Sequence, residues 1–218
     1  RPRRSIDVQR KERVRDPAVR AGRIGSAAGR IILSVSVVVK TMRRQKRIAI
    51  IGGGPTAVYT LRNLLQKADE LEITIFEAGR VAGCGIPYSP EHNTPDMLAN
   101  ITSVEIPPVL VSLADWVRSA DARLLKTFGI ERDQVAERDY YPRVLIGAYY
   151  ISQLESMIAS SAPWHKVNIK TETRVLDIKP DGTGFKIITR KNTVTATQQF
   201  DAVVMATGHL SEPAKMKS

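Results

Sequence analysis

The sequence has a single cysteine and no long hydrophobic run, and both features exclude classes of protein. Cys84 stands alone among 218 residues, which rules out an internal disulfide, a cysteine metal cluster and a redox-active cysteine pair. The longest apolar run, residues 31–39, is far shorter than the roughly 20 residues that span a bilayer. We therefore expect no membrane partner and a cytoplasmic location. The three histidines, His92, His165 and His209, are too scattered to suggest a metal site.

A net positive charge is also missing from most of the chain, although the net charge of the whole sequence is +11. Residues 1–47 hold 15 Lys and Arg against three acids, whereas residues 48–218 hold 18 against 19. Binding to nucleic acid needs a basic face that neutralises phosphates. Because residues 48–218 are nearly neutral, we expect no nucleic-acid partner for them.

The first 41 residues contain neither methionine nor aromatic residues, and Met42 stands six residues before an apolar strand. We interpret residues 1–41 as a basic, disordered leader: an upstream extension, a cloning remnant or a mis-called start. A targeting sequence is the alternative, because arginines precede the apolar residues 31–39. The acids within the leader and the lack of a small-residue cleavage site weaken it. The folded domain is expected over residues 42–218.

A short apolar strand beginning at Ile48 runs into a glycine turn and then a helix. Gly52 permits a tight turn, Gly54 lets the backbone approach a phosphate, and the small Ala57 lets helix and strand pack closely. The helix directs unpaired N–H groups and its positive dipole end at the phosphate charge. This pattern predicts a binding site for a dinucleotide pyrophosphate, formed by Gly52, Gly53, Gly54, Pro55, Thr56 and Ala57.

A second strand, residues 73–76, ends in Glu77 and completes a β-α-β unit. Glu77 follows Gly52 by 25 residues, where a carboxylate accepts hydrogen bonds from ribose hydroxyls and disfavours a 2′-phosphate. Residues 79–90 are rich in glycine and proline and are predicted to form a loop. A helix capped by Ser112 is predicted to run to Leu125, and another to start at Pro142 and run to residue 158.

The pattern then changes to alternation, which predicts antiparallel strands over residues 173–178, 185–189 and 193–197 with turns at 181–182 and 191–192. The last strand, residues 202–206, is continuously apolar, as expected for a parallel strand buried on both faces. It ends in a second turn of small residues, Thr207 and Gly208. The fold class is therefore α/β, with a parallel sheet and an inserted antiparallel β-meander.

These features, in this order, resemble the FAD-NAD(P)-binding family of two-dinucleotide-domain flavoproteins over residues 47–210. The resemblance implies a Rossmann-like FAD-binding domain of an oxidoreductase, of the NAD(P)H-dependent flavin monooxygenase type. It is carried by Gly52 to Ala57, by Glu77, by Pro87-Tyr88-Ser89 with Met97-Leu98-Ala99-Asn100, by Tyr141-Pro142-Arg143 with Gly147 and Tyr149, and by Ala206-Thr207-Gly208-His209.

The resemblance also implies the roles of particular residues. The FAD pyrophosphate meets the turn from Gly52 to Ala57, and the adenosine ribose meets Glu77. The backbone of Val175 reads the adenine edge, and Thr207 and Gly208 close over the pyrophosphate side of the flavin. Such flavoproteins carry a second nucleotide-binding unit for NAD(P)H. That unit is absent from this chain, so we expect it to be truncated relative to the family.

Two other functions remain open. Glu77 suits NAD as well as FAD, which allows an NAD-binding enzyme or sensor. The chain could also be a truncated, non-catalytic flavin-binding module. We assign no catalytic residue, and the small-molecule substrate, the direction of electron flow and the oligomeric state stay undetermined.

Several polar and aromatic residues also have structural interpretations. Cys84 is expected to be a packed residue, and Arg143 to pair with Asp139 rather than anchor an anion. Asn100 is a candidate substrate contact, and His209 a candidate contact to cofactor or substrate. The tyrosines at 140, 141, 149 and 150 are expected in the core.

Overall fold

A computed structural model describes residues 45–208 of the chain. The predicted leader, residues 1–41, and the candidate contact His209 lie outside the described residues. The division into a leader and a folded domain from residue 42 therefore stays a prediction.

A four-stranded parallel sheet forms the centre of the described structure, with the strand order β3-β2-β1-β7. Ile48 of β1 lies opposite Ile73 of β2 on one side and Ala202 of β7 on the other. The two middle strands consist largely of buried apolar residues, as expected for parallel strands covered on both faces. The strands are β1 (Lys46–Ile51), β2 (Leu71–Phe76), β3 (Lys166–Lys170) and β7 (Ala202–Met205).

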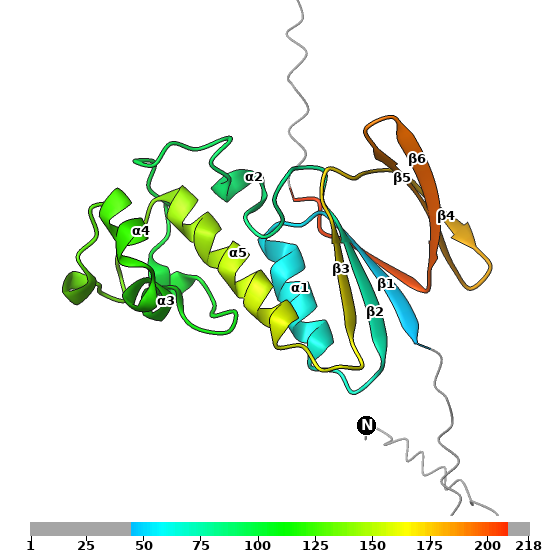
Figure 1. Ribbon diagram of the computed structural model, residues 1–218, viewed down its shortest axis with the longest axis horizontal. Helices are drawn as coiled ribbons and strands as arrows, with labels where there is room; N and C mark the ends of the chain where they lie inside the picture. The colour runs from blue at the N-terminus through cyan, green and yellow to red at the C-terminus, as the bar shows by residue number, and fades with distance from the viewer. Residues whose placement is uncertain (1–44, 209–218) are drawn as a thin grey trace, which may run out of the picture. The chain divides into compact units, whose positions relative to one another are not determined.

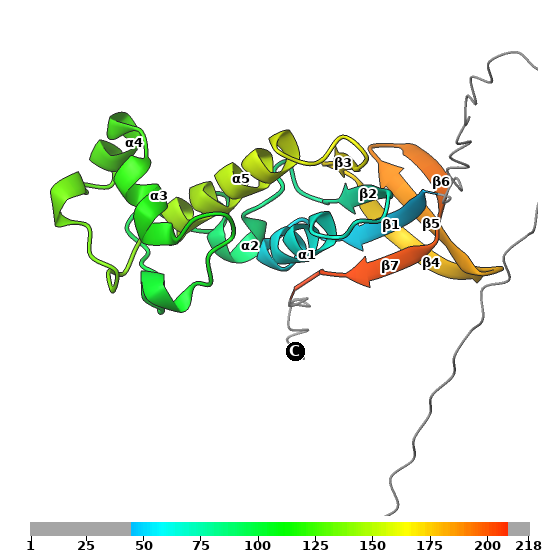
Figure 2. The same cartoon turned by 90° about the horizontal axis from the view of Figure 1, so that it is seen from below.

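The two faces of this sheet pack against different layers, because successive side chains of a strand point to opposite sides. Ile48 and Ile50 share a core with helices α1 (Pro55–Leu65) and α5 (Arg143–Ala159). Ala49 and Ile51 instead join a core with the antiparallel sheet. Figures 1 and 2 show the resulting order of helices, parallel sheet and antiparallel sheet. That second sheet contains β4 (Arg174–Asp181), β5 (Gly184–Lys191) and β6 (Val194–Phe200).

The predicted α/β fold with an inserted meander is confirmed. Its turns lie where the sequence placed them, with Gly182 and Asn192 both at positive φ. One strand was missed: residues 166–170 form β3, a parallel edge strand, and not the start of the meander. The prediction that the last strand is buried on both faces is wrong. The strand β7 is at the sheet edge, and Met205 is 60% exposed.

The segment between β2 and α5 contains the short helices α2 (Gly85–Tyr88), α3 (Leu113–Ser119) and α4 (Ala122–Thr127), with 3₁₀ turns at Ser103–Glu105 and Arg132–Gln134. Of these helices, α2 and α3 pack against α5, while α3 and α4 lie on the side of α5 away from α1 (Figure 1). The expected loop at residues 79–90 therefore includes a turn of helix. The expected single helix from residue 113 to Leu125 is two helices, because Ala120 is extended and the Asp121 carboxylate caps a new start.

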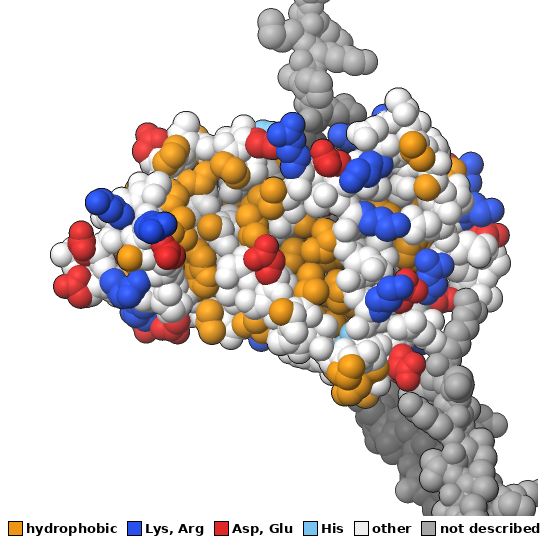
Figure 3. Space-filling model, in the orientation of Figure 1, with side chains coloured by type: hydrophobic (Ala, Val, Ile, Leu, Met, Phe, Trp, Pro, Cys, Tyr) orange, Lys and Arg blue, Asp and Glu red, His pale blue; other side chains and the backbone are white. Residues whose placement is uncertain are grey.

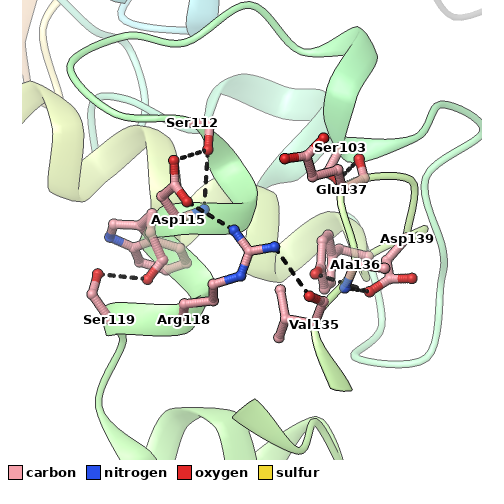
Figure 4. Close-up of polar contacts among 11 residues, drawn as sticks. Ser103, Ser112, Asp115, Arg118, Ser119, Val135, Ala136, Glu137 and Asp139 are labelled. Carbon is pink, nitrogen blue, oxygen red and sulfur yellow. Dashed lines mark hydrogen bonds and ion pairs between the residues drawn. The ribbon is translucent and has the colours of Figure 1, made fainter. Parts of the chain in front are cut away.

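Local capping fixes the start of α3 as predicted. The Ser112 hydroxyl oxygen accepts a hydrogen bond from the backbone N–H of Asp115 at 3.1 Å. Figure 4 shows how Arg118 then joins α3 to the following loop, by donating to the Asp115 carboxylate and to the Val135 carbonyl oxygen. The same view shows Asp139 accepting from the backbone N–H of Ala136. These bonds order the segment that leads into α5.

Candidate functional site

The glycine turn joins the carboxyl end of β1 to α1, and its geometry depends on Gly52. This residue has φ +97°, and a Cβ atom there would clash with the backbone of Ala206 and Thr207. Only glycine fits, because L-residues rarely adopt this φ and the turn touches the end of β7. The first predicted site residue is thus brought directly against the second predicted turn at Thr207.

Gly54 differs from Gly52 because its backbone is ordinary. It is the N-cap of α1, with φ −80° and ψ −169°, and has no side chain to cap the helix. A Cβ atom at Gly54 would lie 3.4 Å from the Cα atom of Gly85, which is a normal van der Waals contact. The fold therefore has room for a Cβ atom at Gly54.

The Glu77 carboxylate holds the turn in place. Its two oxygens accept hydrogen bonds from the N–H groups of Gly53, at 2.7 Å, and of Gly79, at 2.6 Å. A carboxylate oxygen has two lone-pair directions, so each oxygen retains one for a further donor. Glu77 is only partly buried. It can therefore support the turn and still accept hydroxyl groups from a ligand.

An account of the N–H groups shows which amides of the turn can meet a phosphate. Those of Gly52, Gly53, Ala57 and Val58 already donate to protein acceptors, and Pro55 has none. Among residues 45–208 no acceptor is found for the N–H groups of Gly54 and Thr56. Both lie in the first turn of α1, where the helix dipole favours an anion. Ala57 is buried, in agreement with its predicted packing role.

The remaining predicted residues follow β7 of the parallel sheet or lie in β4 of the antiparallel sheet. Thr207 and Gly208 are exposed and directly follow β7, and Gly208 has φ +67°. Val175 is in β4, two residues after Thr173, whose N–H donates to the carbonyl oxygen of Glu77. The structure thus brings together segments that lie far apart in the sequence. Their contacts with a ligand stay predictions.

A loop and α5 pack against the outer side of the glycine turn. The N–H of Gly83 donates to the Gly53 carbonyl oxygen at 2.6 Å, and Gly83 packs against Ile151 of α5. One turn earlier in α5, a Cβ atom at Gly147 would strike the Tyr88 carbonyl oxygen. Gly147 therefore permits the close approach of α2 and α5, a role that the sequence pattern did not reveal.

Two motifs that are 40 residues apart in the sequence lie side by side. The Ala99 N–H donates to the Tyr141 carbonyl oxygen, the Arg143 N–H donates to the Met97 carbonyl oxygen, and Leu98 forms a β-bridge with Pro142. These bonds fix the backbone on both sides of the bridge. Asn100, the candidate substrate contact, is exposed next to it.

The expected ion pair between Arg143 and Asp139 is not present. The Asp139 carboxylate accepts instead from the Ala136 N–H at 2.7 Å and the Tyr141 hydroxyl at 3.3 Å. Among residues 45–208 no hydrogen bond or ion pair to the Arg143 side chain is found, and its Nε atom is buried without a partner. An unpaired buried donor costs about 1–3 kcal/mol, so a missing acceptor is a notable feature of this site.

Cys84 and the tyrosines behave as packed residues. Cys84 is 2% exposed, and burial raises the pKa of its thiol. Burial also raises the pKa of Tyr149 to about 12 and raises that of Tyr150. The Tyr149 hydroxyl donates to the Val111 carbonyl oxygen at 2.8 Å and accepts from the Val109 N–H at 3.0 Å. The core interpretation therefore holds for Cys84, Tyr141, Tyr149 and Tyr150, whereas Tyr140 is 54% exposed.

The cavities of the described structure lie away from the glycine turn. One of about 390 Å³ is at the end of the antiparallel sheet, near Asp181 and Phe200. Another of about 440 Å³ lies where α1 and α5 end, near Leu65 and Met157. Figure 3 shows hydrophobic side chains gathered over these two helices. The residues at the glycine turn line neither of these two cavities.

Comparison with known proteins agrees with this geometry. Residues 49–210 match the FAD-NAD(P)-binding family. The chain belongs to this family. It is 36% identical over 166 residues to YdhS of Escherichia coli (strain K12), an uncharacterized protein, and the matched segment is 76% of this chain and 31% of YdhS. The chain therefore spans less than a third of this family member's length.

Solved structures show the same fold. Bacillithiol disulfide reductase Bdr (YpdA) from Bacillus cereus is 18% identical, with a TM-score of 0.52 over 79% of this chain and 43% of that chain. A flavin monooxygenase from Stenotrophomonas maltophilia is 14% identical, with a TM-score of 0.50 over 75% of this chain and 38% of the other. Both cover the FAD-NAD(P)-binding part described above.

Two further observations concern the described residues alone. Within residues 45–208 no helix is long and apolar enough to cross a membrane. In the same range no group of three or more His, Cys, Asp or Glu side chains is arranged to hold a metal ion. A cytoplasmic location and the absence of membrane and nucleic-acid partners stay predictions.

Proposed function

We propose that this chain is the FAD-binding portion of an oxidoreductase, of the NAD(P)H-dependent flavin monooxygenase type. The observation that carries the proposal is Gly54. Its backbone conformation suits any residue and the fold leaves room for a Cβ atom, yet the residue is glycine, and among residues 45–208 its own N–H group and that of Thr56 have no acceptor. A phosphate approaching the start of α1 would account for both features.

The residues fit the cofactor as follows. The N–H groups of Gly54 and Thr56 would bind the pyrophosphate, while Gly52 and Gly53 shape the turn and have their own N–H groups engaged. The free lone pairs of Glu77 would accept the ribose hydroxyls. The backbone of Val175 would read the adenine edge, and Thr207 and Gly208 would adjoin the flavin side of the pyrophosphate.

The chemistry of such an enzyme belongs to the flavin, which when bound accepts and donates electrons. The chain's own contribution would be to bind the dinucleotide, orient it along the sheet edge and position it against a substrate. Because no NAD(P)H-binding unit is found in the described fold, turnover with NAD(P)H is proposed for the longer proteins that this chain resembles.

The alternative of an NAD-binding enzyme or sensor depends on Glu77, whose carboxylate suits the ribose of either cofactor. A second alternative is a flavin-binding module without catalysis. Neither is favoured by an observation of its own, whereas the inserted antiparallel sheet supports the flavoprotein interpretation.

Titration with cofactors separates these functions. The purified full chain is incubated with FAD or with NADH, freed of excess ligand, and examined for flavin absorbance and for quenching of its tryptophan fluorescence. We expect FAD to be retained and NADH to bind far more weakly. Tight NADH binding without FAD uptake would favour the NAD-binding enzyme or sensor over the FAD-binding oxidoreductase. A colourless protein that does not bind added FAD would refute the proposal. Anaerobic addition of NADPH to the flavin-loaded chain then tests whether it can reduce the flavin.

A further inference from the structure

Arg143 is a cation for which no acceptor is found among residues 45–208. Its guanidinium group carries five N–H donors and no acceptor atom. Its Nε atom is buried and makes no hydrogen bond. The nearest acid in the sequence, Asp139, already accepts from the Ala136 N–H and the Tyr141 hydroxyl. The described part of the chain therefore holds a charged donor group for which residues 45–208 supply no oxyanion.

The backbone that carries Arg143 is firmly placed. Its N–H donates to the Met97 carbonyl oxygen at 2.8 Å, and the neighbouring Ala99 N–H donates to the Tyr141 carbonyl oxygen at 2.9 Å. Arg143 is also the first residue of a 17-residue helix. A cation presented from such a rigid position can bind a carboxylate or phosphate with two parallel hydrogen bonds.

The location of Arg143 relates it to the glycine turn. Residues spaced by four share one face of a helix, so Arg143 lies on the face of α5 that carries Gly147 and Ile151. Ile151 packs against Gly83, whose N–H donates to Gly53 in the turn. With a rise of 1.5 Å per residue, Arg143 lies about 12 Å from Ile151, toward the N-terminal end of α5. Arg143 is therefore about two helical turns away from the contact between α5 and the loop at Gly83.

We infer that Arg143 binds a carboxylate or phosphate group of a second ligand, one that lies beside the cofactor and not the cofactor itself. The identification of that ligand as the flavin's reaction partner rests on the proposed function. The adjoining Met97 and Leu98 are 43% and 55% exposed. Such a ligand would place its charged group on Arg143 and an apolar part on these two side chains.

The test uses thermal unfolding of the full chain without cofactor. Inorganic phosphate and acetate are titrated separately at an ionic strength held constant with sodium chloride, so that general screening is the same throughout. The variants are Arg143→Gln, which removes the charge, and Arg143→Lys, which keeps the charge but loses the planar fork. Arg123→Gln is the matched control, because Arg123 is an exposed arginine of α4.

We expect at least one of the two anions to raise the melting temperature of the wild type and of Arg123→Gln. The apparent affinity for that anion should fall about tenfold or more in Arg143→Gln, because a charge-assisted hydrogen bond is lost. In Arg143→Lys the affinity should fall less. The inference is overturned if Arg143→Gln responds like the wild type, or if neither anion stabilises the wild type beyond sodium chloride. Whichever anion binds more tightly identifies the group as phosphate or carboxylate.

FAD titration of the same variants separates this inference from the proposed function. Unchanged FAD affinity in Arg143→Gln supports a second ligand, whereas a parallel loss of FAD affinity would assign Arg143 to the cofactor and overturn the inference. If the wild type fails to bind FAD but retains the effect of anions through Arg143, the proposed function fails and the anion site stands.

Discussion

Replacing Gly54 by alanine should abolish most FAD binding while leaving the fold intact. The backbone at Gly54 has φ −80°, and the new Cβ atom would lie 3.4 Å from Gly85, so no strain or clash is introduced. Alanine is a poorer N-cap than glycine, which costs about 0.5–1 kcal/mol. For a domain of this size that lowers the melting temperature by roughly 2–4 °C.

The effect on FAD binding should be larger, because the added methyl group would lie where we propose that the phosphate meets the N–H groups of Gly54 and Thr56. Loss of one charge-assisted hydrogen bond is worth about 1.5–3 kcal/mol, or roughly 10- to 150-fold in the dissociation constant. Flavin fluorescence titration of the wild type and of Gly54→Ala measures this directly.

A suitable control is Gly129→Ala, in an open turn after α4. Gly129 has φ +62° and would place its Cβ atom in free space. Alanine there is strained by about 1 kcal/mol because of its positive φ, a destabilisation like that of Gly54→Ala, and FAD affinity should be unchanged. Gly52→Ala is unsuitable, since it would disrupt the turn itself. If Gly54→Ala binds FAD as tightly as the wild type does, our account of the glycine turn is wrong.

Three further predictions concern stability. Glu77→Gln leaves the N–H group of Gly53 or Gly79 facing the side-chain NH₂ group of glutamine, which cannot accept a hydrogen bond. The free energy of unfolding, measured with urea, should fall by about 1–3 kcal/mol. Glu155→Gln, at an exposed position, is the control and should not lower it. Burial raises the pKa of the Cys84 thiol above its usual value of about 9 in the folded state. The contribution of the buried neutral thiol to the free energy of unfolding is therefore present below pH 9 and is lost as the pH rises through the folded-state pKa. Cys84→Ala should therefore lose less stability than the wild type between pH 8 and 10.5, and an equal loss would contradict this. His165 is 7% exposed with both ring nitrogens unpaired, so His165→Leu should not lower the melting temperature, since no hydrogen bond is removed.

Local sequence signals predicted the elements that depend on neighbouring residues. The strand, glycine turn and helix from Ile48 onward were predicted correctly because each has a characteristic local pattern: an apolar run, closely spaced glycines, and apolar residues at helical spacing. The hairpin turns at Gly182 and Asn192 were found for the same reason. The strand β3 was missed because residues 166–170 alternate like meander strands, and only pairing with β2 shows that it belongs to the parallel sheet.

The sequence also misjudged features that depend on distant contacts. Residues 202–205 are apolar like a central strand, but β7 lies at the edge, since no described strand follows it. The partner expected for Arg143 was chosen by proximity in sequence. In the structure, the Asp139 carboxylate instead accepts hydrogen bonds from the Ala136 N–H and the Tyr141 hydroxyl.

By itself, the sequence determined the family, the fold class and the positions of the two small-residue turns, because these follow from residue type and spacing. Only the tertiary structure showed which amides of the glycine turn have no acceptor within residues 45–208. The N–H group of Gly52 donates to the carbonyl oxygen of Phe76 in β2, and that of Gly53 donates to the Glu77 carboxylate directly after β2. The tertiary structure also shows that Arg143 has no acceptor within residues 45–208. Hydrogen-bond partners that are distant in sequence are set by the packing of strands and helices, which no local pattern records.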